Sequence, residues 1–129
     1  MTVFAIFVGA GLGGVTRYAL SAWIQDAAGA GFPWGTLVVN VSGSLLLTFG
    51  YAVLEGTTAP AEWRAFLGIG ILGGYTTFST FSYETLALLK DGEWTRAGFY
   101  AVASVLLSLA ATFLGFALAR EAIAWRTRV

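Results

Sequence analysis

Four long apolar segments make up most of this chain, and they constrain its fold more than any other feature. They run from Thr2 to Ile24, from Gly35 to Leu54, from Trp63 to Leu89 and from Thr95 to Ala119. A helix needs about 20 apolar residues to cross the hydrocarbon core of a bilayer, and each segment is long enough. We therefore predict an all-α integral membrane protein in which residues 1–129 form a single domain of four transmembrane helices.

The composition supports this class and excludes others. Hydrophobic residues make up 57% of the chain and charged residues 11%, whereas ordinary soluble domains carry about 25% charged residues. Histidine and cysteine are both absent, which removes the most common general base and all thiol chemistry. The net charge is zero and no basic patch occurs, so nucleic acid is not an expected partner. We predict that the chain is not an enzyme.

The first apolar segment is interpreted as a membrane span. A signal peptide carries a positively charged start and a shorter apolar region. Here the apolar stretch is longer than that region, and no lysine or arginine precedes it.

Positive charge is distributed almost evenly between the two sides that four spans create. The side of both termini holds four basic residues, namely Arg64, Arg120, Arg126 and Arg128. The other side holds Lys90 and Arg96, and Arg17 is a third if its side chain extends to that interface. Such a small difference gives only a weak preference for one orientation. It permits insertion both ways and hence an antiparallel homodimer. Small residues such as Gly9 and Gly13 would allow close helix packing, within the chain or between copies.

The third segment is interrupted by the polar stretch 73–82, which reads Gly-Gly-Tyr-Thr-Thr-Phe-Ser-Thr-Phe-Ser. Each of its two glycines weakens a helix by up to about 1 kcal/mol relative to alanine. A bilayer tolerates non-helical backbone only where protein buries it or where it lines a wet cavity. We predict a break and a specialised site here. Phe78 and Phe81 would share one helix face, either as core packing or with their positive ring edges towards an anion.

Several polar residues lie within the apolar segments. Arg17 either lines a vestibule that attracts anions or extends to the interface. Glu84 belongs to an interface or vestibule, with a proton site as the alternative. Asn40 shares a face with Thr36 and Ser44 at four-residue spacing. Its amide either bonds another helix or donates into a pore.

The fourth segment carries a polar residue at every fourth position, namely Tyr100, Ser104, Ser108 and Thr112. Four helical residues advance about 400°, so this series forms a gently wrapping stripe on one face. Hydroxyl groups that bond back to their own helix are one explanation. Four hydroxyl groups at this regular spacing favour a hydrated path along the helix.

The stretch 73–82 closely resembles the signature of the small fluoride channels of bacteria, the Fluc or CrcB family. The resemblance covers the whole chain, including the glycine-rich first segment with Arg17, the stretch 36–43 (Thr-Leu-Val-Val-Asn-Val-Ser-Gly) and the polar stripe. It implies a fluoride-selective channel in the bacterial inner membrane that exports fluoride passively and lowers its cytoplasmic level. It also implies an antiparallel, dual-topology homodimer with two pores and a central structural sodium ion.

The resemblance assigns roles to particular positions. Residues expected to line the fluoride pore are Phe78, Phe81, Asn40, Ser79, Thr80, Tyr100, Ser104, Ser108 and Thr112. Arg17 matches the family's first-helix arginine and is assigned to the vestibule together with Glu84. Backbone carbonyls of Gly73 and Thr76 would hold the sodium ion.

Two other functions fit the sequence less well. Small multidrug transporters also have four spans, but they rely on a glutamate in the first helix, where this chain has Arg17 and no acid between Thr2 and Ile24. A structural or assembly subunit leaves the polar stripe unexplained.

Overall fold

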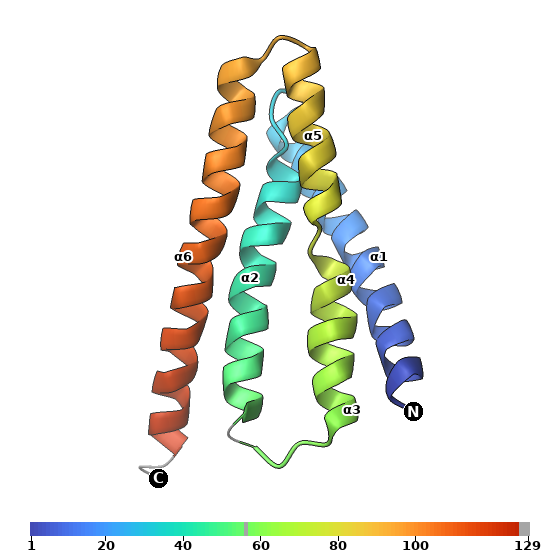
Figure 1. The fold of residues 1–129 in the computed structure, drawn as a ribbon, viewed down its shortest axis with the longest axis vertical. Helices are drawn as coiled ribbons and strands as arrows, with labels where there is room; N and C mark the ends of the chain where they lie inside the picture. Colours follow the sequence, from blue (N-terminus) through green and yellow to red (C-terminus); the bar gives the residue numbers. More distant parts are fainter. Residues whose placement is uncertain (56, 127–129) are drawn as a thin grey trace.

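The computed structural model describes residues 1–55 and 57–126, and every regular element in these residues is a helix. In chain order they are α1 (Thr2–Ala28), α2 (Trp34–Glu55), α3 (Ala61–Arg64), the π-helix η1 (Ala65–Leu72), α4 (Gly73–Tyr75), α5 (Phe78–Lys90) and α6 (Trp94–Arg126). Figure 1 shows α1, α2 and α6 as long rods, with α3, η1, α4 and α5 following one another along a further rod. The all-helical prediction is confirmed.

Three helices of the described part are long and apolar enough to cross a membrane: Thr2–Ala28, Trp34–Glu55 and Trp94–Trp125. The third predicted segment, 63–89, is not a single helix. It is divided among shorter elements that run from α3 to α5, so none of its pieces reaches that length. Length and composition therefore support three of the four predicted spans.

Two helices continue beyond their apolar segments by a turn or more. α1 extends past Ile24 to Ala28, and Gly29 follows it with a φ of 90°, a value that glycine adopts at little cost. α6 extends past Ala119 to Arg126. A helix does not have to end where hydrophobicity ends, because its backbone bonds continue through polar turns. Asp26 thus lies in the last turn of α1.

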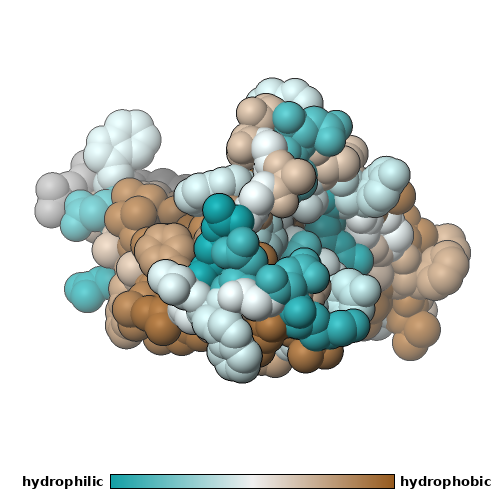
Figure 2. All heavy atoms as spheres, turned by 90° about the horizontal axis from the view of Figure 1, so that it is seen from above, coloured by the Kyte–Doolittle hydropathy of each residue, from teal (hydrophilic) through white to brown (hydrophobic). Residues whose placement is uncertain are grey.

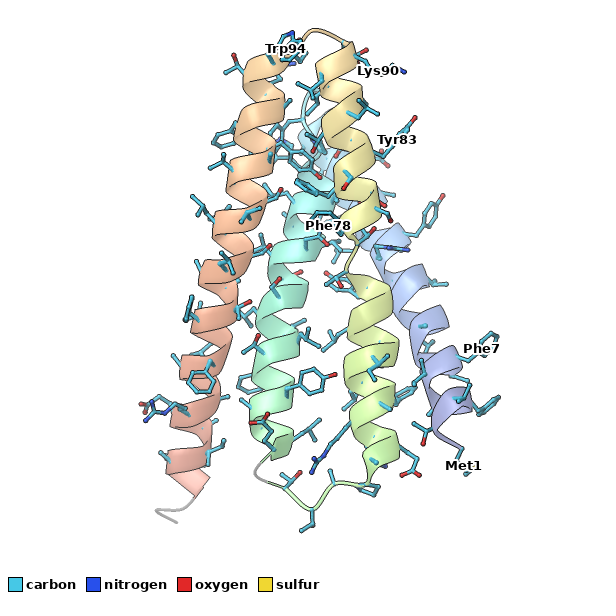
Figure 3. All side chains as sticks on the ribbon, viewed as in Figure 1. Met1, Phe7, Phe78, Tyr83, Lys90 and Trp94 are labelled. Atoms are coloured by element: carbon cyan, nitrogen blue, oxygen red, sulfur yellow. The ribbon has the colours of Figure 1, made fainter. Side chains whose placement is uncertain are left out.

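The start of α1 and the end of α6 lie at the same end of the bundle (Figure 1). Lys90 and Trp94 mark the opposite end, where α5 turns into α6 (Figure 3). Figure 2 looks onto that end and shows hydrophilic residues across its middle and hydrophobic ones around much of its outside. Arg128, which contributes to the predicted charge bias, lies outside the described residues.

Packing is close where small residues face a neighbouring backbone. α2 lies mainly along α6, and α1 lies along η1 and α4. A Cβ atom added at Gly9 would come within 2.6 Å of the Phe66 carbonyl oxygen, and one at Gly13 would overlap the carbonyl oxygen of Ile71. The Gly9 and Gly13 pair therefore serves packing within the chain.

We expect Gly13→Ala to destabilise the protein strongly and Gly11→Ala to leave it unharmed. Both substitutions gain the same helix propensity, about 1 kcal/mol. The new methyl at residue 13 meets backbone, whereas a Cβ at Gly11 has no atom of the described residues within 4 Å. Melting temperatures of the two purified variants in one detergent test this. Equal stability would contradict the packing seen between α1 and η1.

The outer surface is largely apolar. Tyr100 and Val39 are the largest fully buried side chains, while many other large apolar residues are exposed. Phe7 and Tyr83 point away from the bundle (Figure 3). This distribution is typical of a protein surrounded by lipid, where apolar side chains need not be turned inward.

Candidate functional site

The helical path is interrupted at two threonines. Thr76 (φ −83°, ψ 157°) and Thr77 (φ −153°, ψ 115°) are extended, between the end of α4 at Tyr75 and the start of α5 at Phe78. The two glycines of the stretch are helical instead. At Gly74 the missing side chain allows close approach of α1, since a Cβ would lie 2.6 Å from the Ala10 carbonyl oxygen.

The side chain of Asn40 on α2 holds the backbone of Thr77 through two hydrogen bonds. Its Nδ2 donates to the Thr77 carbonyl oxygen at 2.9 Å, and its Oδ1 accepts from the Thr77 N–H at 2.8 Å. A backbone N–H only donates and a carbonyl only accepts, so this pairing fixes the orientation of the amide. Asn40 joins α2 to the interruption, and its second Nδ2 hydrogen stays available to another acceptor.

Thr77 also caps the N-terminus of α5. Its Oγ1 accepts from the Thr80 N–H at 3.2 Å and donates to Thr80 Oγ1 at 3.0 Å, and it lies 3.3 Å from Ser79 Oγ. The residue is only 8% exposed. Sequence reasoning did not select Thr77 as a site residue. The available signal was a threonine directly before a helical run, because threonine is a preferred cap.

A cleft of about 360 Å³, here called the inner cleft, opens beside the interruption. Among the described residues that line it none is ionisable: Asn40, Ser44, Leu47, Thr76, Thr77, Phe78, Phe81, Ser104, Val105, Ser108 and Leu109. The ring centroids of Phe78 and Phe81 are 5.3 Å apart. Ser104 is 7% exposed, and its Oγ has no hydrogen-bond partner within the described residues. A buried hydroxyl without a partner is costly, which suits a site where another group supplies one.

A second cleft of about 670 Å³, here called the outer cleft, lies nearer the end that carries Asp91. Its lining includes Arg17, Thr77, Thr80 and Glu84. Arg17 donates to the Thr76 carbonyl oxygen at 3.4 Å, so its side chain reaches the interruption. Thr77 lines both clefts.

Glu84 on α5 is held by two neutral hydroxyl groups. Thr36 Oγ1 donates to Glu84 Oε1 at 2.9 Å, and Tyr100 Oη donates to Oε2 at 2.7 Å. The Tyr100 ring also packs against Phe81, with 5.2 Å between centroids, and edge-on against Phe32 at 5.4 Å. A chain of contacts thus connects the carboxylate of the outer cleft to the phenylalanine pair of the inner cleft.

The structure brings together some of the predicted pore residues and separates others. Five of them line the inner cleft, namely Asn40, Phe78, Phe81, Ser104 and Ser108. Four do not: Thr80 lines the outer cleft, Ser79 is exposed, Tyr100 bonds Glu84, and the Thr112 hydroxyl donates back to the Ser108 carbonyl at 3.0 Å. One explanation for the polar stripe is that its hydroxyls bond to carbonyls of their own helix, and this holds for Thr112.

The carbonyls of Gly73 and Thr76 have lost the donors that a continuous helix would give them. In an α-helix the N–H of residue i donates to the carbonyl of residue i−4. The Thr77 N–H goes to Asn40 instead of Gly73, and the Thr80 N–H goes to Thr77 Oγ1 instead of Thr76.

These two carbonyls fit a hard cation, which takes oxygen ligands. Arg17 contacts the Thr76 oxygen, but a carbonyl has two lone pairs. Among the described residues no group of three or more histidine, cysteine, aspartate or glutamate side chains could hold a metal ion. A cation at the interruption would therefore depend on backbone carbonyls and on the uncharged hydroxyl and amide oxygens beside them.

Comparison with known proteins identifies one matching family and several similar proteins. Residues 4–116 match the family described as "CrcB-like protein, Camphor Resistance (CrcB)". The chain belongs to the CrcB-like protein family. Relatives in this family include the "Fluoride-specific ion channel FluC" of Thermus thermophilus, which is 50% identical over 114 residues, covering 88% of this chain and 89% of the relative.

Two further CrcB-like relatives carry the same name. The protein of Geobacter metallireducens is 49% identical over 122 residues, with 94% of this chain and 98% of the relative covered. That of Paramagnetospirillum magneticum is 45% identical over 119 residues, with 89% and 92% covered. The predicted family resemblance is confirmed. Relatives named as ion channels also agree with a multi-pass membrane protein that is not an enzyme.

Proposed function

We propose that this chain is a fluoride-selective channel that lets fluoride leave the bacterial cytoplasm passively through the inner membrane. The observation that carries the proposal is the inner cleft, whose described lining residues are uncharged and include Ser104, whose hydroxyl has no hydrogen-bond partner among the described residues. The names of the relatives give the ion, since each is called a fluoride-specific channel.

The chemistry of the inner cleft suits a small, strongly hydrated anion. Such an ion must exchange water for donors, and the hydroxyls of Ser104 and Ser108 and the second N–H of Asn40 are available for this. The edges of the Phe78 and Phe81 rings carry positive partial charge. Because none of these groups is ionised, they can stabilise fluoride without binding it too tightly to leave, which conduction requires.

The outer cleft acts as a vestibule in this proposal. Arg17 supplies positive charge that draws anions towards the interruption. Both oxygens of Glu84 are already engaged by the Thr36 and Tyr100 hydroxyls, which lowers their repulsion of an entering anion. Ser79 and Thr80 add hydroxyls at the start of α5.

Passive export has a simple acid–base reason. Neutral hydrogen fluoride crosses membranes and dissociates in the cytoplasm, where the charged fluoride ion is trapped. A selective channel lets the trapped ion flow out down its electrochemical gradient, and this lowers cytoplasmic fluoride without an energy source.

A second copy of the chain, inserted in the opposite orientation, would complete each of two pores. Phe78 lines the inner cleft and is nevertheless 77% exposed, so a path along its ring needs a further wall. The near balance of basic residues between the two sides allows the antiparallel arrangement. Carbonyls of Gly73 and Thr76 would hold a structural sodium ion, which would fix the interrupted segments in place.

Fluoride efflux from proteoliposomes tests the main proposal. Purified protein in liposomes loaded with potassium fluoride should release fluoride rapidly once valinomycin lets potassium follow, as recorded with a fluoride electrode. Liposomes loaded with potassium chloride should release far less, and protein-free liposomes give the background. Equal efflux of both anions, or none above background, would defeat it.

A further inference from the structure

We propose that Asn40 and Thr77 are positioning residues for the cation site. They keep the carbonyls of the interruption open by capturing the two backbone donors that would otherwise occupy them. This inference rests on the proposed function, since it concerns the same sodium ion.

Asn40 accepts the hydrogen bond of the first of these two backbone donors. A continuous helix through the interruption would direct the Thr77 N–H to the carbonyl of Gly73. The Asn40 Oδ1 accepts this N–H at 2.8 Å, and the Asn40 Nδ2 secures the same residue by donating to its carbonyl at 2.9 Å. The Gly73 oxygen is left without its helical donor.

Thr77 accepts the hydrogen bond of the second backbone donor. The Thr80 N–H would belong to the carbonyl of Thr76 in a continuous helix. The Thr77 Oγ1 takes it at 3.2 Å. Among the described residues, the side-chain donor to the Thr76 oxygen is then Arg17, at the long distance of 3.4 Å. One lone pair of this oxygen stays free for a cation.

The same two side chains line the fluoride path. Asn40 and Thr77 both belong to the wall of the inner cleft, where Thr77 is 8% exposed. The hydrogen bonds that open the carbonyls therefore also fix the position of two groups that the anion would meet. Loss of either capture is expected to affect the cation site and the anion cleft together.

The simpler explanation is that these bonds only cap α5 and tie it to α2. The two explanations differ in one measurable way. A cap lost from the fold lowers stability by the same amount at every sodium concentration. Loss of the cation site changes how stability responds to sodium, because a ligand of the folded state raises the melting temperature according to its concentration relative to its Kd.

The experiment is a sodium titration of the melting temperature of the full-length protein in detergent, with N-methyl-D-glucamine chloride keeping ionic strength constant. The wild type should melt higher as sodium rises. Thr77→Val, which keeps the shape but lacks the hydroxyl, should need at least about tenfold more sodium for the same response, a difference large enough to resolve. Thr77→Ser keeps the acceptor and should restore the wild-type midpoint.

Two further variants make the test decisive. Thr77→Gly also lacks the hydroxyl, and glycine is a much better helix cap than valine. It serves if the valine variant does not fold, with the same shift expected. Ser104→Ala alters the inner cleft without touching either captured donor, and its sodium midpoint should equal that of the wild type.

Each alternative outcome has a distinct meaning. If the valine and glycine variants melt lower but keep the wild-type sodium midpoint, the Thr77 hydroxyl only caps α5. This inference is then overturned while the proposed function stands. If the wild type itself shows no response to sodium, the proposed ion and this inference both fall. Fluoride efflux from the same preparation then tells whether the channel proposal survives without sodium.

Discussion

Phe81→Ile should reduce the rate of fluoride efflux from proteoliposomes at least about tenfold, which corresponds to about 1.4 kcal/mol of barrier. The ring of Phe81 lies 5.3 Å from Phe78 and 5.2 Å from Tyr100, measured between centroids. Isoleucine retains an apolar side chain of similar size but offers no ring edge to an anion. The initial efflux rate per reconstituted protein is the measurement, and an unchanged melting temperature would establish that the fold survives.

A matched control shows whether the effect is specific to the ring of Phe81 or follows the loss of any phenylalanine. Phe113 on α6 is 74% exposed and lines neither cleft, so Phe113→Ile should conduct like the wild type. Phe78→Ile provides the second test of the pair, and its efflux should fall as well. Wild-type efflux from both the Phe78 and Phe81 variants would remove the rings from the mechanism.

The helical membrane architecture was predictable because it follows from length and hydropathy alone. The position of the extended residues was not. Low helix propensity drew attention to Gly73 and Gly74, yet both are helical and Gly74 packs closely against Ala10. The extended residues are Thr76 and Thr77, and Thr77 is bonded to Asn40, which is 37 residues away in the chain. A propensity difference of about 1 kcal/mol is easily outweighed by such a contact.

Spacing alone also left the polar residues of α6 undetermined. Ser104 and Thr112 occupy equivalent places in a four-residue repeat. The Ser104 hydroxyl is buried with no partner among the described residues, whereas the Thr112 hydroxyl bonds its own helix. The difference lies in what faces each residue, which a single helix cannot specify. Likewise, the four-residue repeat of Thr36, Asn40 and Ser44 identified a polar face. The partners of that face on α5 and at the interruption emerged only from the fold.

Asn40→Leu is expected to be among the most destabilising single substitutions in the chain. Leucine can neither donate to nor accept from Thr77, so the buried Thr77 N–H loses its partner. The Thr77 carbonyl loses the Asn40 donor but, as the N-cap of α5, still accepts the first hydrogen bond of that helix. Each buried polar group left unsatisfied costs about 1–3 kcal/mol. The unpaired Thr77 N–H therefore gives an expected loss of about 1–3 kcal/mol, a substantial part of the 5–15 kcal/mol that typically separates folded from unfolded protein.

Ser44→Ala supplies the comparison, because it lies one turn further along the same face of α2 and lines the same cleft. The Ser44 hydroxyl donates only to the Asn40 carbonyl of its own helix, at 2.8 Å, a bond whose loss leaves no N–H unpaired. Its melting temperature should stay close to that of the wild type, while that of Asn40→Leu falls sharply. If the two variants melt alike, the side chain of Asn40 does not hold the interruption in place. Its contribution would then be confined to the ion path, and fluoride efflux would be the property that its loss impairs.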